Sequence, residues 1–292
     1  MHPSVPALRR SAARSLGVWA ALALLAGAAW HPPSAAQAQA QAQAQNQTQA
    51  PTAAPPATRR SGLDFMSPAL QALQRDDSQN PGLLALQDGA ALWRSPAGSA
   101  QKSCADCHGG PDAAPRSMAG VATRYPAWDP GAGTALNLAG RINSCRQRHQ
   151  QAAALPADHA DALALETYVG FQSRGLPLAP PADARLAPLR AQGAALWGQR
   201  LGQLNLACSH CHDQRAGQKL AGATIPQAHA SNYPSYRLEW QGLGSLQRRL
   251  RGCVVGVRAE PFAPDATEWL ALEAFLAQRA AGMVVEIPGV RP

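Results

Sequence analysis

Two copies of the pentapeptide Cys-x-x-Cys-His, at residues 104–108 and 208–212, constrain the fold of this chain more than any other feature. Two cysteines at this spacing can reach the two vinyl groups of one porphyrin, and the adjacent histidine then lies beneath the iron as its proximal ligand. A redox dithiol or half of a zinc site would have similar spacing. The paired occurrence favours two covalently bound haem c groups, held by Cys104, Cys107, His108, Cys208, Cys211 and His212.

Further repeats indicate that the chain consists of two related halves. Gly-Ala-Ala-Leu-Trp occurs at residues 89–93 and again at 193–197, each time eleven residues before the first cysteine of the haem motif. Leu-Ala-Leu-Glu occurs at residues 163–166 and again at 270–273. Because the repeats keep their order and nearly their spacing, we predict two tandem domains that arose by duplication.

Both halves are predicted to be mainly α-helical and rich in loops. One helix ends shortly before each haem motif, with Trp93 or Trp197 on its apolar face, and a second helix carries the Leu-Ala-Leu-Glu segment. Candidate N-caps and C-terminal glycines of the second helices are Asp158, Asp265, Gly175 and Gly282. Strand signals are scarce, and 25 glycines with 25 prolines imply long loops. This pattern is typical of cytochrome c-like domains, in which the haem forms much of the core.

The N-terminus is predicted to be an export signal. Three arginines precede an apolar run at residues 16–29, which is short for a membrane span, and Ala-Gln-Ala at 36–38 offers a cleavage site. We therefore expect a signal peptide at residues 1–38, a periplasmic protein, and no membrane span after cleavage. An uncleaved anchor is the alternative.

Composition also suggests the domain boundaries. Residues 39–62 contain mainly Ala, Gln and Pro without periodicity, which predicts a disordered tether. A proline-rich linker is expected at 177–188, between a first domain at 63–176 and a second at 189–292. Removal of the signal arginines lowers the formal charge from +8 to +5, and haem propionates would offset most of the rest. A nucleic-acid partner therefore has little support.

Two cysteines remain outside the haem motifs, and the duplication suggests their role. Cys145 follows Cys104 by 41 residues, and Cys253 follows Cys208 by 45. Each lies upstream of the repeated terminal helix. Equivalent positions suggest equivalent roles, so each is predicted to bind the iron of its own half as the distal thiolate ligand. A disulfide between them is the alternative in an oxidising compartment.

Methionine and histidine are the other candidate distal ligands. None of them occupies equivalent positions in the two halves. Packing or surface roles are expected for Met66, Met118 and Met283. Bis-histidine coordination through His149, His159 or His229 stays open as a less favoured alternative.

Arginines are concentrated near Cys253. Thiolate ligation lowers a haem potential relative to methionine ligation, which favours sulfur chemistry over simple electron transport. Arg249 precedes Cys253 by four residues on a predicted helix, so it projects to the same side and could hold an oxyanion near the sulfur. Arg141 occupies the same place before Cys145, so this spacing does not identify the catalytic half. A solvated surface or haem propionates are the expected partners of Arg248, Arg251 and Arg258.

Several segments together resemble the SoxA family, the dihaem cytochrome c subunits of the SoxAX complex in bacterial thiosulfate oxidation. Besides the haem motifs, they are Arg-Tyr-Pro at 124–126, Arg-Ile-Asn-Ser-Cys-Arg at 141–146, the stretch 237–262 and Glu-Ile-Pro-Gly-Val-Arg-Pro at 286–292. The resemblance implies that Cys145 and Cys253 are distal ligands. It also implies that Cys253 is the active-site residue, carried as a persulfide, and that Arg249 binds substrate.

The implied activity is that of an L-cysteine S-thiosulfotransferase. Thiosulfate would be joined oxidatively to a cysteine of the SoxYZ carrier protein as an S-thiosulfonate. The electrons would pass to the SoxX subunit of a heterodimer and then to a soluble cytochrome c. A non-catalytic periplasmic electron-transfer cytochrome is the main alternative, and a dihaem peroxidase is a weaker one because it needs an accessible iron.

Overall fold

The structure is a computed structural model that describes residues 58–109 and 118–292. The predicted signal peptide and most of the predicted tether lie outside these residues. Among the helices that the structure describes, none combines the length and the hydropathy that a membrane span requires.

The described chain is mainly helical, with short strands between the helices, in agreement with the predicted loop-rich α class. The α-helices are α2 (Pro68–Arg75), α3 (Leu83–Arg94), α4 (Ala105–His108), α6 (Leu138–Cys145), α7 (Ala160–Phe171), α8 (Ala187–Gly198), α9 (Cys208–His212), α10 (Leu246–Gly256) and α11 (Thr267–Arg279). Shorter helical turns are η1 (Gly62–Phe65), η2 (Ala122–Arg124), η3 (Arg146–Gln150) and η4 (Ala184–Leu186). The strands are β1 (Ala127–Asp129), β2 (Thr134–Leu136), β3 (Lys219–Leu220), β4 (Ala223–Thr224), β5 (Ser235–Arg237), β6 (Gly242–Gly244) and β7 (Gly289–Arg291).

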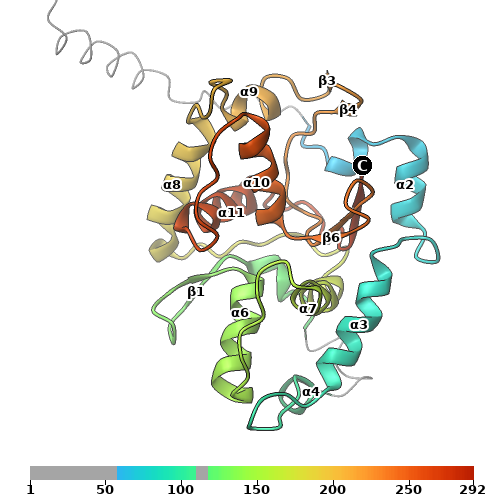
Figure 1. Ribbon diagram of the computed structural model, residues 1–292, viewed down its shortest axis with the longest axis vertical. Coiled ribbons are helices and arrows are strands. Elements are labelled where there is room, and N and C mark those ends of the chain that lie inside the picture. Colours follow the sequence, from blue (N-terminus) through green and yellow to red (C-terminus); the bar gives the residue numbers. More distant parts are fainter. Residues whose placement is uncertain (1–57, 110–117) are drawn as a thin grey trace, which may run out of the picture. The chain divides into compact units, whose positions relative to one another are not determined.

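One pair of helices forms the framework of each half. Helix α3 packs on α7 in the first half, and α8 packs on α11 in the second. In Figure 1, α8, α9, α10 and α11 form one group of helices, while α3, α4, α6 and α7 form another. Trp93 and Trp197 lie in the last turns of α3 and α8 and are each 3 % exposed. The prediction of a helix before each haem motif is therefore confirmed.

The predicted N-cap of α7 is wrong by one residue. His159 is the N-cap, and its Nδ1 accepts a hydrogen bond of 3.2 Å from the backbone N–H of Asp161. Asp158 adopts a positive φ of 59° and its carboxylate accepts from the backbone N–H of Ser245 at 3.0 Å. Because this carboxylate binds the start of α10 in the other half, it does not cap its own helix.

The start of α11 also differs from the prediction by one residue, whereas the glycines after both helices agree with it. Ala266, and not Asp265, is the N-cap of α11, and no side chain caps this end. Gly175 and Gly282 adopt positive φ values of 83° and 80° a few residues after α7 and α11 end. Glycine is favoured there because a Cβ atom strains the left-handed conformation.

A strand hairpin followed by a helix occurs in both halves. The first unit is β1–β2–α6 and the second is β5–β6–α10. In the hairpins, Asp129 pairs with Thr134, and Arg237 pairs with Gly242. Every strand and the start of the helix are displaced by the same number of residues between the two units. Asp129 and Arg237 are therefore structurally equivalent, although one is an acid and the other a base.

The C-terminal strand joins the second half to the segment that precedes α3. Strand β7 pairs in parallel with β5. The side-chain oxygen of Gln74 in α2 accepts hydrogen bonds from the backbone N–H of Val290, at 2.9 Å, and from Arg291 Nη1, at 2.5 Å. Helix α2, which belongs to the predicted first domain, therefore also contacts the end of the chain.

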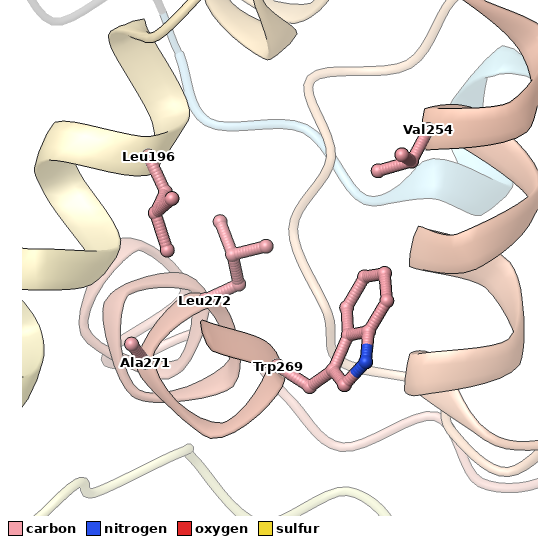
Figure 2. Packing of buried hydrophobic residues seen from close by; sticks show 5 residues of the cluster. All are labelled: Leu196, Val254, Trp269, Ala271 and Leu272. Atoms are coloured by element: carbon pink, nitrogen blue, oxygen red, sulfur yellow. The ribbon is translucent and has the colours of Figure 1, made fainter. Parts of the chain in front are cut away.

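Buried apolar side chains fix α10 in the second half. The cluster contains Leu196, Val254, Trp269, Ala271 and Leu272, from α8, α10 and α11. Leu196 and Leu272 face each other across the α8–α11 pair, and the Trp269 indole stands beside α11 on the side of α10 (Figure 2). Trp269 is fully buried, and its Nε1 donates to the carbonyl of Ala263 at 2.8 Å. Burial of Val254 fixes the rotation of α10 and thereby the position of the adjacent Cys253.

Candidate functional site

The predicted haem residues of the first half surround one cavity. The cavity has a volume of about 290 Å³, and its walls include Cys104, Cys107, His108 and Cys145. The Trp93 indole faces the His108 imidazole with 5.5 Å between the ring centres. Burial lowers the pKa of His108, so the imidazole is neutral and able to bind a metal ion.

Two alternative distal ligands border the same cavity, namely Met118 and His149. Met118 is 8 % exposed and packs with Trp93, Leu138 and Val169, which agrees with the packing role expected for it. His149 is exposed in the turn that follows α6. The equivalence of Cys145 and Cys253 in the two hairpin–helix units continues to favour cysteine.

The remaining alternative ligands occupy other places and do not line this cavity. His159 caps α7, as described above, and Met283 packs against a separate buried cluster at the C-terminal end of α11. His229 is 6 % exposed, and burial lowers its pKa to about 4. Met66 lies partly buried next to η1.

Neither spare cysteine forms the alternative disulfide. All six cysteines lie in the described part of the chain, and none is bonded to another. Burial raises the pKa of Cys104, and the neighbouring Cys145 adds to this rise. In the second half, burial and then the neighbouring Cys253 raise the pKa of Cys208 to about 11. Each spare cysteine is therefore near enough to the first motif cysteine of its own half, Cys104 or Cys208, to act on its pKa.

His212 in the second half is oriented as a proximal ligand would be. Its Nδ1 lies 2.7 Å from the carbonyl oxygen of Pro226, so Nδ1 carries the proton and the lone pair of Nε2 stays available. Burial lowers the pKa of this imidazole. The Trp197 indole faces the ring at 5.7 Å, and its Nε1 donates to Asp213 at 2.7 Å.

These arrangements fit a c-type haem in both halves. The second haem motif forms α9, in which Cys208 and Cys211 lie three residues apart on one short helix. His210, inside this motif, has a local role, because its Nδ1 accepts a hydrogen bond of 3.1 Å from the backbone N–H of Ala207. A pair of thiols, a neutral imidazole and a largely apolar wall are the groups that covalent haem attachment requires.

The two arginines that precede the spare cysteines differ in their partners. In the first half, Arg141 Nη1 donates to Asp129 Oδ2 at 2.6 Å, and Arg148 Nη1 lies 3.4 Å from Oδ1 of the same carboxylate. Asp129 is only 5 % exposed. The backbone N–H of Ala132 and the Arg141 guanidinium lower the pKa of Asp129 to about 2. The carboxylate is therefore ionised at neutral pH and neutralises Arg141.

Among the residues that the structure describes, no carboxylate is bound to Arg249 in the second half. Within residues 58–109 and 118–292, its side chain makes neither an ion pair nor a hydrogen bond. Burial opposes its charge, but the neighbouring Cys253 and Tyr233 outweigh that effect and raise the pKa of Arg249. The second half thus places a partly buried, unpaired cation beside the spare cysteine, and this difference between the halves is not visible from the spacing alone.

Tyr233 is a further site residue, which the sequence analysis missed. Burial raises the pKa of its hydroxyl, which therefore stays protonated, and the charges of Arg249, Arg237, Arg291 and Cys253 also act on this pKa. Tyr125 has the equivalent position in the first half, and a cis proline follows each tyrosine. The repeated Tyr-Pro dipeptide is the sequence signal that could have identified this residue.

The other arginines near Cys253 have different surroundings. The Arg248 guanidinium lies 4.2 Å from the centre of the Trp240 ring, in a cation–π contact. Arg258 is exposed and adopts a positive φ of 58° after α10. Arg251 is partly buried on α10 and makes no side-chain ion pair within the described residues.

Comparison with known proteins detects the same duplication. The family of SoxA/TsdA cytochrome c domains matches the chain twice, at residues 88–178 and 192–285. The two matches confirm the prediction of two tandem cytochrome c-like domains.

Individual relatives are similar over most of their length. The L-cysteine S-thiosulfotransferase subunit SoxA of Pseudaminobacter salicylatoxidans is 36% identical over 232 residues, which cover 79% of this chain and 80% of the relative. The same subunit of Rhodovulum sulfidophilum is 34% identical over 232 residues, with 80% of each chain covered. In the crystal structure of SoxXA from P. pantotrophus, one chain matches with a TM-score of 0.75 and 30% identity, covering 80% of this chain and 87% of that chain.

Proposed function

The chain belongs to the SoxA/TsdA family of cytochrome c domains, and on this basis we propose that it joins thiosulfate oxidatively to a cysteine of a carrier protein. The activity is that of an L-cysteine S-thiosulfotransferase, as in the names of the SoxA relatives. The observation that carries the proposal is the unpaired Arg249 beside Cys253 in the second half. A cation and a thiol side by side suit a reaction between a sulfur oxyanion and another sulfur atom.

Cytochrome c domains bind haem c, and we infer one such group in each half of this chain. In the first half, at residues 63–176, it is held by Cys104, Cys107 and His108, with Cys145 as the distal ligand. In the second half, at residues 189–292, it is held by Cys208, Cys211 and His212, with Cys253 as the distal ligand. Haem c supplies a one-electron acceptor next to the sulfur when it is bound.

The net reaction joins the outer sulfur of thiosulfate to the thiol of the carrier cysteine. One S–S bond forms, the thiol releases its proton, and two electrons leave the sulfur atoms, which gives a carrier S-thiosulfonate. Cys253, carried as a persulfide, is the sulfur through which the group is transferred. Arg249 binds the sulfonate oxygens by charge-assisted hydrogen bonds, and the protonated hydroxyl of Tyr233 is a neutral donor at the same place.

Three partners and a location complete the proposal. The chain forms a heterodimer with a SoxX cytochrome c subunit, which is supported by the match to the SoxXA structure. The SoxYZ protein supplies the carrier cysteine. The two electrons leave to SoxX and then to a soluble cytochrome c. The periplasm is the proposed location, because covalent haem attachment and the predicted signal peptide both fit export.

Reduction of cytochrome c by thiosulfate tests the proposal. The purified heterodimer with SoxYZ is expected to reduce cytochrome c, and Cys253→Ala is expected to abolish this activity while the Cys208–His212 haem attachment is kept. Mass spectrometry of the peptide that contains Cys253 should detect one additional sulfur atom. Haem content measured as the pyridine haemochrome shows whether the variant is intact.

The same assay separates the alternatives. Unchanged turnover in Cys253→Ala with full haem content would contradict the proposal and favour a non-catalytic electron carrier. Peroxide turnover by the isolated chain, without a response to thiosulfate, would indicate a peroxidase.

A further inference from the structure

One position in the duplicated hairpin carries opposite charges in the two halves. Asp129 is the last residue of β1, and Arg237 is the last residue of β5. Both strands pair with a second strand in the same register, and both hairpins lead into the helix that carries the spare cysteine. The two side chains therefore start from the same place relative to Arg141 in one half and Arg249 in the other.

In the first half, the acid at this position neutralises the neighbouring cation. The Asp129 carboxylate accepts from Arg141 at 2.6 Å and from the backbone N–H groups of Gly131 and Ala132 at 2.8 and 3.0 Å. Asp129 is 5 % exposed, which holds the carboxylate in a fixed position, although the Arg141 side chain keeps 42 % of its surface exposed. An anion that approached Arg141 would have to displace a carboxylate that is already bound and fixed in place.

In the second half, the base at this position adds to the positive charge. Arg237 is 9 % exposed, and its guanidinium lies 5.1 Å from the centre of the Trp240 ring. Arg248, the neighbour of Arg249 on α10, contacts the same ring at 4.2 Å. The end of β5 and the start of α10 are thus connected through one indole, which both guanidinium groups contact.

Arg237 also forms an ion pair with Glu239. Its Nε donates to Glu239 Oε1 at 2.7 Å, and Glu239 is the one acid among the groups that perturb the pKa of Arg249. The Glu239 side chain is 51 % exposed. Because Arg237 holds this carboxylate at the surface, Arg249 keeps its charge available.

We propose that this position decides which half binds the thiosulfate anion: Asp129 blocks the site at Cys145, and Arg237 keeps the site at Cys253 open. The two residues are positioning residues, since they act through Arg141 and Arg249. The groups whose charges raise the pKa of Arg249 are Cys253, Tyr233 and Glu239, and burial of the site strengthens their interactions. The inference rests on the proposed function only in taking thiosulfate as the anion and Arg249 as its partner.

Equilibrium dialysis of radiolabelled thiosulfate against the haem-loaded full chain tests the inference by counting bound anions. The natural chain is expected to bind one thiosulfate. Asp129→Asn should bind two, because the neutral amide releases Arg141 but its oxygen can still accept from Gly131 and Ala132. Arg237→Asp should bind at least about tenfold more weakly, since the new carboxylate would pair with Arg249. Arg237→Lys keeps the charge and should keep the single site.

Matched controls separate this effect from general changes of charge. Asp183→Asn removes another carboxylate that binds an arginine, Arg185, at a surface turn, and Arg200→Asp reverses an exposed charge of the second half. Both should leave one bound anion. Haem content and circular dichroism identify any variant that has not folded. Asp129→Asn and Arg237→Asp lie in different halves, so each tests the inference even if the other variant does not fold.

Specific outcomes would overturn the inference. They are the absence of bound thiosulfate in the natural chain, one bound anion in a folded Asp129→Asn chain, or undiminished binding by folded Arg237→Asp. The proposed function is judged separately, by thiosulfonate formation on the carrier protein. Turnover without the expected change in stoichiometry would overturn only the inference, whereas the expected stoichiometry without turnover would overturn only the function.

Discussion

Gly193 in α8 lies directly against the backbone carbonyl of Ala271 in α11, with no room between them for a Cβ atom. Gly89 in α3 has the same relationship to the carbonyl of Ala164 in α7. The close approach of each helix pair explains why glycine begins both copies of the Gly-Ala-Ala-Leu-Trp repeat. It also brings Trp93 to His108 and Trp197 to His212.

Gly193→Ala is expected to destabilise the haem-loaded chain by about 1–3 kcal/mol, because the added methyl group must push α8 and α11 apart. Chemical denaturation followed by circular dichroism measures this change. Gly198→Ala, at the end of α8, is the matched control, since a Cβ atom there would meet no other atom within 4 Å. Equal stabilities of the two variants would show that the helices can separate without cost.

Each spare cysteine is expected to contribute one thiolate-ligated haem. Low-temperature EPR of the oxidised chain should give rhombic low-spin signals of the His/thiolate type, because thiolate is a strong axial donor. Cys145→Ala and Cys253→Ala should each remove the signal of one half and leave the other. A spectrum of the natural chain with only methionine-type or bis-histidine signals would refute the assignment of both cysteines.

Arg249→Ala is expected to lower kcat/KM for thiosulfate by about 100-fold, the effect of losing charge-assisted hydrogen bonds to the sulfonate group. Arg141→Ala is the matched control and should change kcat/KM by less than about twofold, because Arg141 is already bound to Asp129. Steady-state reduction of cytochrome c with SoxYZ measures both. Similar losses in the two variants would mean that the ion pair in the first half does not distinguish the sites.

Acidic residues between the two halves should make stability depend on pH. Burial raises the pKa of Glu273 to about 7, and burial together with the Glu273 charge raises the pKa of Glu166 to about 8. The ordinary pKa of a glutamate is 4.5, so between these values the unfolded chain releases protons that the folded chain retains. Stability therefore decreases as pH rises from about 5 to 8.

Glu273→Gln should remove part of this dependence. The variant cannot ionise, yet its side-chain oxygen can still accept the hydrogen bond that Asn137 donates to Glu273 at 3.2 Å. At pH 8 we expect it to be about 1–3 kcal/mol more stable than the natural chain, with little difference at pH 5. Denaturation curves at both pH values provide the measurement, and Glu260→Gln, at an exposed position, is the control. A stabilisation of the same size at both pH values would exclude ionisation as its cause.

Features that depend on residues close together in the sequence could be predicted well. The haem motifs, the helices on both sides of them and the glycines after α7 and α11 follow from spacing and local preferences. The equivalent positions of Cys145 and Cys253 in the two halves could be predicted because the duplication preserves their order relative to the repeated helices. Asp158 was assigned wrongly as an N-cap, since its carboxylate binds Ser245 in the other half.

The sequence by itself determined where the thiols for haem attachment and the adjacent imidazoles lie, because the Cys-x-x-Cys-His motif is five consecutive residues. It also placed an arginine one helical turn before each spare cysteine. Only the tertiary structure decided which of these arginines is neutralised. Asp129 and Arg141 lie on a strand and a helix that are separate in the sequence, and their side chains meet only when the hairpin folds back onto α6. The same folding brings Arg237 and Arg248 of α10 to one ring, that of Trp240, and no carboxylate of the described residues forms an ion pair with Arg249.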